Sequence, residues 1–468
     1  MVTNNLKYID LCGILRLISF PIFFLIIVVS SLVRAETTIY QGNIFHFTDD
    51  PSINSNAYQY IENGGLVIEK GIVKDIISES DLTKYQDRAK IIDYSGKIIF
   101  PGFIDLHIHY PQTEMIASHG EELLEWLREY TFPTEKKFSD KAYAKEVANF
   151  FIKQLYKNGT TSALVFGTVH PESVNALFEV AEREKMRLIA GKVLMDRNAP
   201  DYLQDSAESG YAESKTLIER WHNRGRLSYA ITPRFAPTST PQQLELAAKL
   251  LNEFPGIYMQ THLAENRKEV EWVKQLFPQA RSYLDVYSLY GLNRDRSIFA
   301  HAIYVDNMDL QSIAKAGSAI AFCPSSNLFL GSGLFPLYKA ESHAVDVGFG
   351  TDVGAGTSFS MFQTMADAYK VIQLQKSMGE NTRVRSLSPF KAFYLATLGA
   401  AKSLNIENKI GNFEKGREAD FIVIDLEATD LLKFRMKHAK NLEEQLFALQ
   451  ILGDDRSIYR TYISGEQK

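Results

Sequence analysis

Between residues 98 and 353 the chain alternates eight apolar, strand-like segments with longer amphipathic stretches. Such alternation is typical of parallel β/α units, and eight units suggest a closed barrel. A doubly wound open sheet is the alternative, but no Gly-x-Gly-x-x-Gly turn follows the first segment to favour it. The eight segments are Ile98–His109, Thr160–Gly167, Arg187–Asp196, Leu227–Ala236, Gly256–Glu265, Ser297–Tyr304, Ser318–Asn327 and Ala344–Val353.

The two chain ends have a different pattern of predicted secondary structure. Short strand-like pieces separated by turn residues lie before residue 98, and similar pieces return near Ala419–Ile424 and Tyr459–Tyr462. We therefore expect a small β-sandwich from both ends, built from residues 36–97 and 404–468, beside a barrel of residues 98–403. Helices are expected in the barrel over Ser139–Lys157, Thr240–Glu253, Asn266–Leu276 and Ser358–Met378.

The first 35 residues have the composition of a targeting segment. Leu17–Val33 is apolar apart from serines and one proline, Lys7 and Arg16 precede it, and Ala35 ends a plausible cleavage site. This pattern predicts a signal peptide cleaved after Ala35, which would make the protein periplasmic or secreted. An uncleaved membrane anchor is one alternative, since the run is just long enough to span a bilayer. A start codon assigned too early is another, and the protein would then be cytoplasmic.

Charge and cysteine content narrow the function classes. The formal net charge is −5, so no basic footprint for nucleic acid is present. The two cysteines are Cys12, in the leader, and Cys323. A structural disulfide is therefore not expected, and a metal site built from cysteines is excluded.

Metal-ligand residue types fall at the carboxyl ends of the predicted strands, where barrel enzymes build their active sites. His107 and His109 lie on one face of a strand, because side chains alternate with a period of two. His262, His301 and Asp352 end three further segments. Imidazoles with one carboxylate suit Zn²⁺, or less readily Fe²⁺.

Each of these signals also has a structural reading. A His-x-His pair can be two hydrogen-bonded strand residues, and Gly-Thr-Asp around Asp352 is a common turn. Glu265 could cap the helix that begins near Asn266. Arg234 could form a salt bridge at the barrel mouth.

Longer motifs make the pattern more specific. They are Pro101–His109, Leu124–Leu127, Tyr130–Pro133, Lys157–Thr161, Thr232–Phe235, Thr261–Arg267, Cys323–Asn327, Gly350–Val353, Leu395–Gly399 and Leu452–Arg456. Through these motifs the chain resembles the amidohydrolase superfamily and, within it, the guanine deaminases, over residues 40–465. The leader departs from that family, whose members are cytosolic as a rule, and so leaves the location open.

The resemblance implies a distorted (β/α)₈ barrel with a small composite β-sandwich, commonly as a homodimer. It implies one Zn²⁺ per subunit, or Fe²⁺ in its place, and a small purine substrate. The metal ligands would be His107, His109, His262 and Asp352, with His301 beside the metal-bound water or as a weak ligand. No lysine lies near the end of the segment Leu227–Ala236 to bridge two metals, so we expect one.

The resemblance also implies roles in catalysis. Zn²⁺ would make hydroxide available at neutral pH for attack on C2 of guanine, with Asp352 taking the proton and His301 aiming the nucleophile. Glu265 would protonate the neighbouring ring nitrogen and then serve the leaving amine. Xanthine and ammonia would be the products, as in purine catabolism or salvage.

Substrate reading would use other side chains. Arg234 can donate two hydrogen bonds to the carbonyl oxygen and N7 of guanine. Gln112 could pair with an amide-like edge, Phe235 and Trp126 could pack the ring, and His262 would face substrate as well as metal. For the two aromatic residues, ordinary packing is an equal alternative.

Two rival functions remain open. The chain could be a deaminase or chlorohydrolase of the superfamily acting on a triazine, cytosine or methylthioadenosine. It could also be an inactive barrel used as a scaffold, although all the expected ligands are present. Deaminases built like cytidine deaminase are excluded, because they need a Pro-Cys-x-x-Cys signature.

Overall fold

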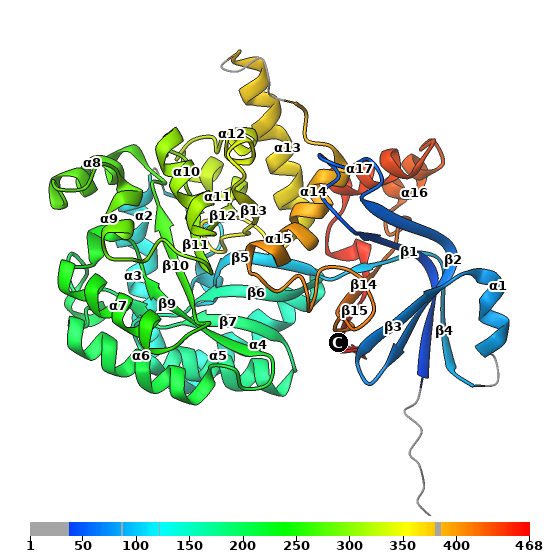
Figure 1. The fold of residues 1–468 in the computed structure, drawn as a ribbon, viewed down its shortest axis with the longest axis horizontal. Coiled ribbons are helices and arrows are strands. Elements are labelled where there is room, and N and C mark those ends of the chain that lie inside the picture. Colours follow the sequence, from blue (N-terminus) through cyan, green and yellow to red (C-terminus); the bar gives the residue numbers. More distant parts are fainter. Residues whose placement is uncertain (1–36, 86–87, 121, 380–384) are drawn as a thin grey trace, which may run out of the picture. The chain divides into compact units, whose positions relative to one another are not determined.

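Eight parallel strands form the continuous path of the larger of two sheets in the computed structural model of this chain (Figure 1). The structure describes residues 37–85, 88–120, 122–379 and 385–468, so the predicted leader lies outside the described residues. Within these ranges, no helix combines the length and apolar character needed to cross a membrane.

The eight strands follow one another in chain order around the sheet and nearly close it. Two backbone hydrogen bonds join the segment just past the last strand to the first, from Asp352 N to His107 O (2.8 Å) and from His109 N to Val353 O (2.9 Å). The predicted barrel is therefore confirmed. Its strands are β5 (Phe103–His109), β6 (Thr160–Phe166), β7 (Arg187–Gly191), β9 (Leu227–Pro233), β10 (Tyr258–Leu263), β11 (Ser297–His301), β12 (Ala319–Phe322) and β13 (Asp346–Phe349), with a short β8 (Val193–Leu194) beside β9.

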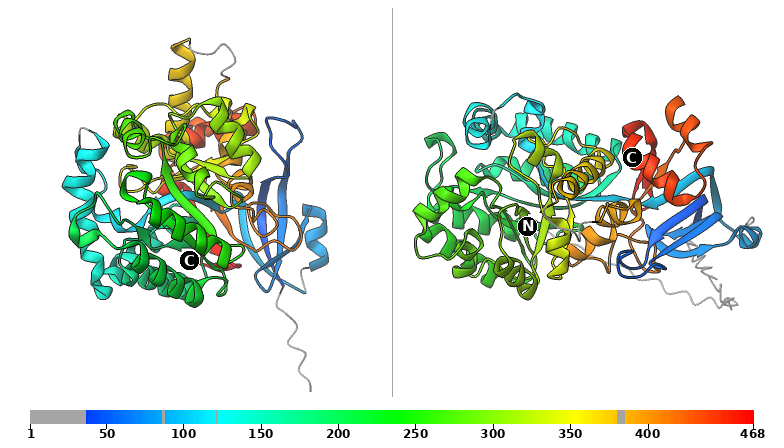
Figure 2. Two further views of the ribbon diagram at one scale, coloured as in Figure 1. Left: turned by 60° about the vertical axis from the view of Figure 1, so that its left-hand side comes forward. Right: turned by 90° about the horizontal axis from the view of Figure 1, so that it is seen from above.

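Helices surround the barrel strands, as Figures 1 and 2 show. All four helices predicted from the sequence are present, as α4 (Lys141–Lys157), α7 (Pro241–Glu253), α8 (Arg267–Leu276) and α13 (Met361–Ser377). Their amino ends carry the expected caps: Asp140 accepts from two backbone N–H groups of α4, and Thr240 from one of α7. Apolar side chains fill both the barrel interior and the layer between strands and helices.

The two chain ends form a second, seven-stranded sheet, as the sequence predicted. Strand β4 lies at its centre, parallel to β1 and antiparallel to β14. The aromatic ring of Tyr40 on β1 packs edge-on against Phe421 on β14, so the inner face has its own core. The strands, in spatial order, are β16 (Glu466–Gln467), β15 (Ile458–Ile463), β14 (Phe421–Ile424), β4 (Lys90–Pro101), β1 (Thr37–Phe47), β2 (Tyr58–Glu69) and β3 (Ile72–Ile77).

Two predicted strands differ from the structure. The segment Ile98–His109 is two strands in different sheets, because the chain passes from β4 to β5 at Gly102. A Cβ at Gly102 would meet the Thr161 hydroxyl at 2.1 Å, so the crossing requires glycine. The segment Ser318–Asn327 contains only the short β12, and Pro324 then begins the helix α11 (Pro324–Phe329).

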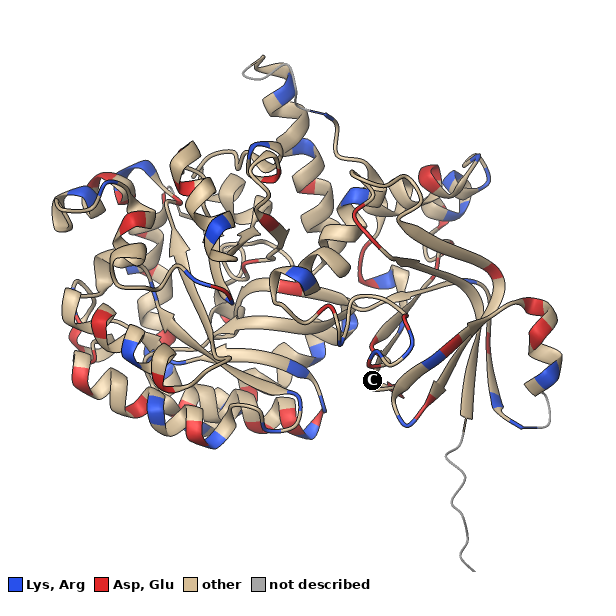
Figure 3. Cartoon of the chain, viewed as in Figure 1, with Lys and Arg blue, Asp and Glu red and all other residues tan. Residues whose placement is uncertain are grey.

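Charged residues lie mainly on the outer helices and loops, and the barrel strands contain few of them (Figure 3). Both signs alternate along the outer helices in that view. The polar side chains inside the barrel are therefore exceptions. They gather at the carboxyl ends of the strands, which is where the candidate site lies.

Candidate active site

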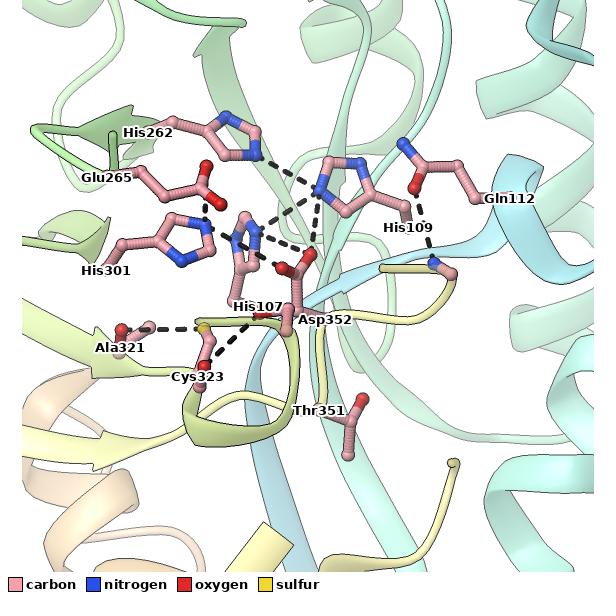
Figure 4. A network of polar contacts seen from close by, with 12 residues as sticks. His107, His109, Gln112, His262, Glu265, His301, Ala321, Cys323, Thr351 and Asp352 are labelled. Atoms are coloured by element: carbon pink, nitrogen blue, oxygen red, sulfur yellow. Dashed lines mark hydrogen bonds and ion pairs between the residues drawn. The ribbon is translucent and has the colours of Figure 1, made fainter. Parts of the chain in front are cut away.

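The five predicted metal ligands converge at the carboxyl ends of the barrel strands (Figure 4). The Nε2 atom of His109 lies 3.2 Å from Nε2 of His107 and 3.2 Å from Nε2 of His262. One carboxylate oxygen of Asp352 lies 3.2 Å from His107 Nε2, and the other lies 3.7 Å from His301 Nε2. Four imidazoles from β5, β10 and β11 and one carboxylate from beyond β13 thus face one point.

Burial keeps three of the imidazoles neutral, as metal ligands must be. It lowers the pKa values of His107 and His262, and lowers that of His109 to about 3. Burial would raise the pKa of Asp352, but the neighbouring His107 and His109 outweigh it and hold the pKa well below its usual value. The set therefore offers neutral nitrogen and anionic oxygen together.

Hydrogen bonds on the far side of two rings fix which nitrogen faces the centre. His262 Nδ1 donates to the backbone oxygen of Arg234 at 2.7 Å, and His301 Nδ1 donates to Asn327 Oδ1 at 2.8 Å. Each bond leaves the Nε2 lone pair directed inward, which is the arrangement of metal-binding histidines.

A buried carboxylate beneath the site positions Asp352. Asp105 accepts from the backbone N–H of His107 and of Thr351, both at 3.1 Å, and from the Thr351 hydroxyl at 2.5 Å. It thereby ties β5 to the loop that carries Asp352. Asp352 itself has a positive φ of 53°, a conformation that non-glycine residues adopt only when the surroundings hold them.

The donor set fits a metal ion of the zinc or iron type. The ring nitrogens of His107, His109 and His262 lie close enough together to bind one ion. The buried Nε2 of His301 has no hydrogen-bond partner among the described residues. Cys323 Sγ also lies near His107, His301 and Asp352, but burial raises the thiol pKa well above its usual value. That thiol is protonated, so it is a poor ligand.

Glu265 lies at the edge of this group with its carboxyl buried. One oxygen lies 3.5 Å from His301 Nε2 and the other accepts from the Ser332 hydroxyl at 3.2 Å. Burial, and then the charge of Asp352, raise its pKa to about 8, so it carries a proton at neutral pH. Its side chain does not cap α8, because the capping box consists of Asn266 and Glu269.

Glu269, which the sequence reasoning missed, fixes the backbone of Glu265. Its carboxylate accepts from the N–H of Glu265 (3.0 Å) and of Asn266 (3.1 Å), and Tyr283 donates to it at 2.6 Å. The capping-box spacing of residues 266 and 269 is a signal that could have identified it.

Arg234 and Gln112 meet at a residue that the sequence reasoning did not single out. Arg234 Nη1 lies 3.0 Å from both carboxylate oxygens of Glu135, and Gln112 Nε2 donates to one of them at 3.2 Å. The salt bridge considered for Arg234 is therefore present. Glu135 lies two residues after the motif Tyr130–Pro133. Nothing in the sequence indicates that it contacts Arg234 at the end of β9.

The two predicted aromatic residues lie in one apolar cluster. Phe235 and Trp126 both belong to an apolar cluster over the barrel mouth, and the Trp126 indole donates to Ser118 O at 3.2 Å. The ring that packs against the imidazoles is Phe166, the last residue of β6, with ring centres 4.5 Å from His109 and 5.0 Å from His107. Phe166 could have been identified from the sequence, because it lies at the carboxyl end of a predicted strand.

Known proteins resemble this chain over most of its length. Residues 98–468 match the Amidohydrolase family. A guanine deaminase from Escherichia coli (strain K12) is 54% identical over 419 residues, covering 89% of this chain and 93% of that one.

Solved structures share the fold. One described as "E. coli Guanine Deaminase" has a TM-score of 0.89 at 52% identity, covering 92% of this chain and 99% of that one. Another, a guanine deaminase from C. acetobutylicum with bound guanine in the active site, has a TM-score of 0.84 at 31% identity, covering 92% and 100%.

Proposed function

Because the chain belongs to the amidohydrolase family and, within it, to the guanine deaminases, we propose that it hydrolyses guanine to xanthine and ammonia with one bound zinc ion. The observation that carries the proposal is the convergence of four imidazoles and the Asp352 carboxylate beside the buried carboxyl group of Glu265. That arrangement supplies both a metal site and a proton donor at the end of a barrel.

The metal would be held by His107, His109, His262 and Asp352, with His301 beside it. A bound zinc ion supplies the Lewis acidity that makes water a nucleophile at neutral pH. The hydrogen bonds from His262 and His301 to their second partners keep the rings in position. Burial of His107, His109, His301 and Asp352 excludes bulk water, while His262 is half-buried.

Proton transfer falls to the two carboxyl groups. Asp352, the more acidic of them, takes a proton from the attacking water, and His301 orients that water between the carboxyl groups of residues 265 and 352. Glu265 gives its proton to the ring nitrogen next to C2 and afterwards serves the leaving amine. The division follows from their pKa values, which the surroundings move in opposite directions.

Recognition of the purine falls to Arg234 and Gln112. Arg234 has donors on Nε and Nη2 beyond those that Glu135 engages, and these suit the carbonyl oxygen and N7 of guanine. Adenine has an amino group in place of that carbonyl and would leave a donor facing a donor. Mismatches of this kind discriminate by orders of magnitude.

The proposal is tested by ammonia release from the purified, zinc-loaded protein. Guanine, adenine, cytosine and a triazine are compared, and xanthine formation is followed by absorbance. Turnover of guanine alone supports the proposal. Turnover of a different heterocycle contradicts the assignment of Arg234 and Gln112, and no turnover with zinc bound favours an inactive scaffold.

A variant separates catalysis from metal binding. Glu265→Gln should lower kcat by at least about 100-fold, since general acid–base catalysis contributes about 10² to 10⁴, while zinc content stays at one per chain. Glu271→Gln makes the same substitution at an exposed position on the following helix, α8, and serves as the control. Normal turnover in Glu265→Gln would remove that residue from the mechanism.

A further inference from the structure

Glu135 is a fully buried carboxylate whose hydrogen bonds all come from side chains of the proposed substrate-reading residues. Its partners are Arg234 and Gln112. Among the described residues, two other carboxylates have no exposed surface, Asp105 and Glu269. These instead accept backbone N–H groups and so have a clear role in the fold. Glu135 therefore acts through the residues that it holds.

One helical turn contacts Arg234 with two side chains. Phe132 and Glu135 are the first and last residues of α3 (Phe132–Glu135), and a spacing of three places them on one face. The Arg234 guanidinium carbon lies 5.7 Å from the centre of the Phe132 ring, while its Nη1 reaches the Glu135 carboxylate. The plane and the charge of the guanidinium are thus both fixed from this helix.

Glu135 also decides which way the Gln112 amide points. A carboxylate only accepts, so the Gln112 NH₂ group must face it. The Gln112 oxygen then faces the Gly354 backbone N–H, which donates to it at 3.2 Å. One N–H and one lone pair of this oriented amide remain for a ligand.

The pair has a further electrostatic consequence. The arginine and the glutamate side chains are 3% and 0% exposed, so their charges cancel in a region with little water to screen them. A site read by a neutral pair favours a neutral heterocycle with a carbonyl group. A lone buried arginine in the same place would instead attract a planar anion.

We propose that Glu135 is a positioning residue that sets substrate specificity. It orients Arg234 and Gln112 and balances the arginine charge, so that the two residues recognise a neutral 6-oxopurine. The proposal rests on the proposed function for its substrate. It assigns no proton transfer to Glu135, so the effect belongs to binding and discrimination and not to the chemical step.

The test compares the full-length, zinc-loaded wild type with Glu135→Gln and Glu135→Asp. The neutral variant should raise KM for guanine about 10- to 100-fold, the range expected for lost hydrogen bonds to a charged group, with kcat within about threefold. Its discrimination between guanine and 2,6-diaminopurine should fall by a similar factor. Glu129→Gln, an exposed carboxylate in the same run of short helices, is the matched control and should leave all three quantities unchanged.

Inhibition by benzoate, a planar monoanion, is a second measurement. Its strength would not change if Glu135 had only a structural role. Benzoate should inhibit Glu135→Gln at least about tenfold more strongly than the wild type, since the unpaired guanidinium is a buried, uncompensated charge. Glu135→Asp keeps the charge and should keep the weak inhibition even though its shorter side chain raises KM. This variant also decides the question if Glu135→Gln does not fold.

The outcomes separate this proposal from the proposed function. A wild type that does not deaminate guanine contradicts the proposed function itself. A wild type that does, together with unchanged KM, discrimination and benzoate inhibition in both Glu135 variants, overturns only the role of Glu135. A fall in kcat at constant KM would also overturn it, because it would place Glu135 in the chemical step.

Discussion

Replacing Arg226 with methionine should destabilise the protein much more than the same change two residues earlier. Arg226 precedes β9 of the barrel and donates to Glu418 (2.5 Å from Nη2) and to Asp420, both of which precede β14 of the chain-end sheet. Its remaining donors reach Lys185 O at 2.9 Å and Ser464 Oγ at 3.1 Å. Asp420 is 2% exposed, so its charge would be left buried and unpaired.

The magnitude follows from that burial. Breaking a buried ion pair by removing one partner costs about 3 to 5 kcal/mol. The lower figure applies here, because Glu418 keeps its second partner, Arg187. With an unfolding entropy of about 2.1 cal/mol/K per residue, residues 36–468 give about 0.9 kcal/mol per kelvin, so the expected fall in Tm is about 3 °C.

The control is Arg224→Met. Arg224 also forms a two-pronged ion pair, with Glu182 at 2.5 and 2.9 Å, but the two side chains are 51% and 40% exposed. Such surface pairs contribute about 0 to 1 kcal/mol, so Tm should change by about 1 °C or less. Calorimetric scans of both variants at one scan rate decide the matter. Equal Tm changes would refute the reasoning that burial makes the Arg226 network important.

Four further predictions concern the site and the leader. Asp105→Asn should weaken zinc retention about 10- to 100-fold against a competing chelator, as losses beside metal ligands do; unchanged retention would contradict its positioning role. Glu269→Ala should lower kcat about 10- to 100-fold by releasing the backbone behind the general acid, with metal content unchanged, whereas Glu271→Ala on the same helix should be silent. Removing the metal with a chelator should abolish deamination. It should also lower the free energy of unfolding by about 2.7 kcal/mol, relative to protein in free zinc at about 100 times Kd. Reloading with Zn²⁺ or Fe²⁺ then shows which ion restores turnover. N-terminal sequencing tests the leader, since a mature chain that begins at Glu36 supports cleavage and an intact Met1 contradicts it.

The barrel and the convergence of the candidate metal ligands could be predicted because their signals are local. Alternating apolar and amphipathic segments set the order of the strands, and parallel strands bring their carboxyl ends to one edge whatever the loops do. His107, His262 and Asp352 each lie at or just past such an end. Their convergence therefore follows from topology alone. The predicted strands were too long, and two of them ran across a sheet crossing at Gly102 or into the helix α11.

The role of Glu135 could not be predicted in the same way, although this residue lies only two positions after the motif Tyr130–Pro133. Its partners come from the short 3₁₀ helix η2 (Tyr110–Met115) after β5 and from the end of β9, 23 and 99 residues away along the chain. The packing of short helices over the barrel mouth brings them together, and no periodicity in the sequence encodes that packing. A buried carboxylate also looks no different in sequence from an exposed one such as Glu129. Ligands that lie on the barrel strands can thus be predicted from fold class, whereas residues that adjust those ligands from a covering segment become evident only from tertiary contacts. If Glu135 controls specificity as proposed, differences in substrate choice among related barrels should be sought in the segment that covers the mouth as well as in the strand ends.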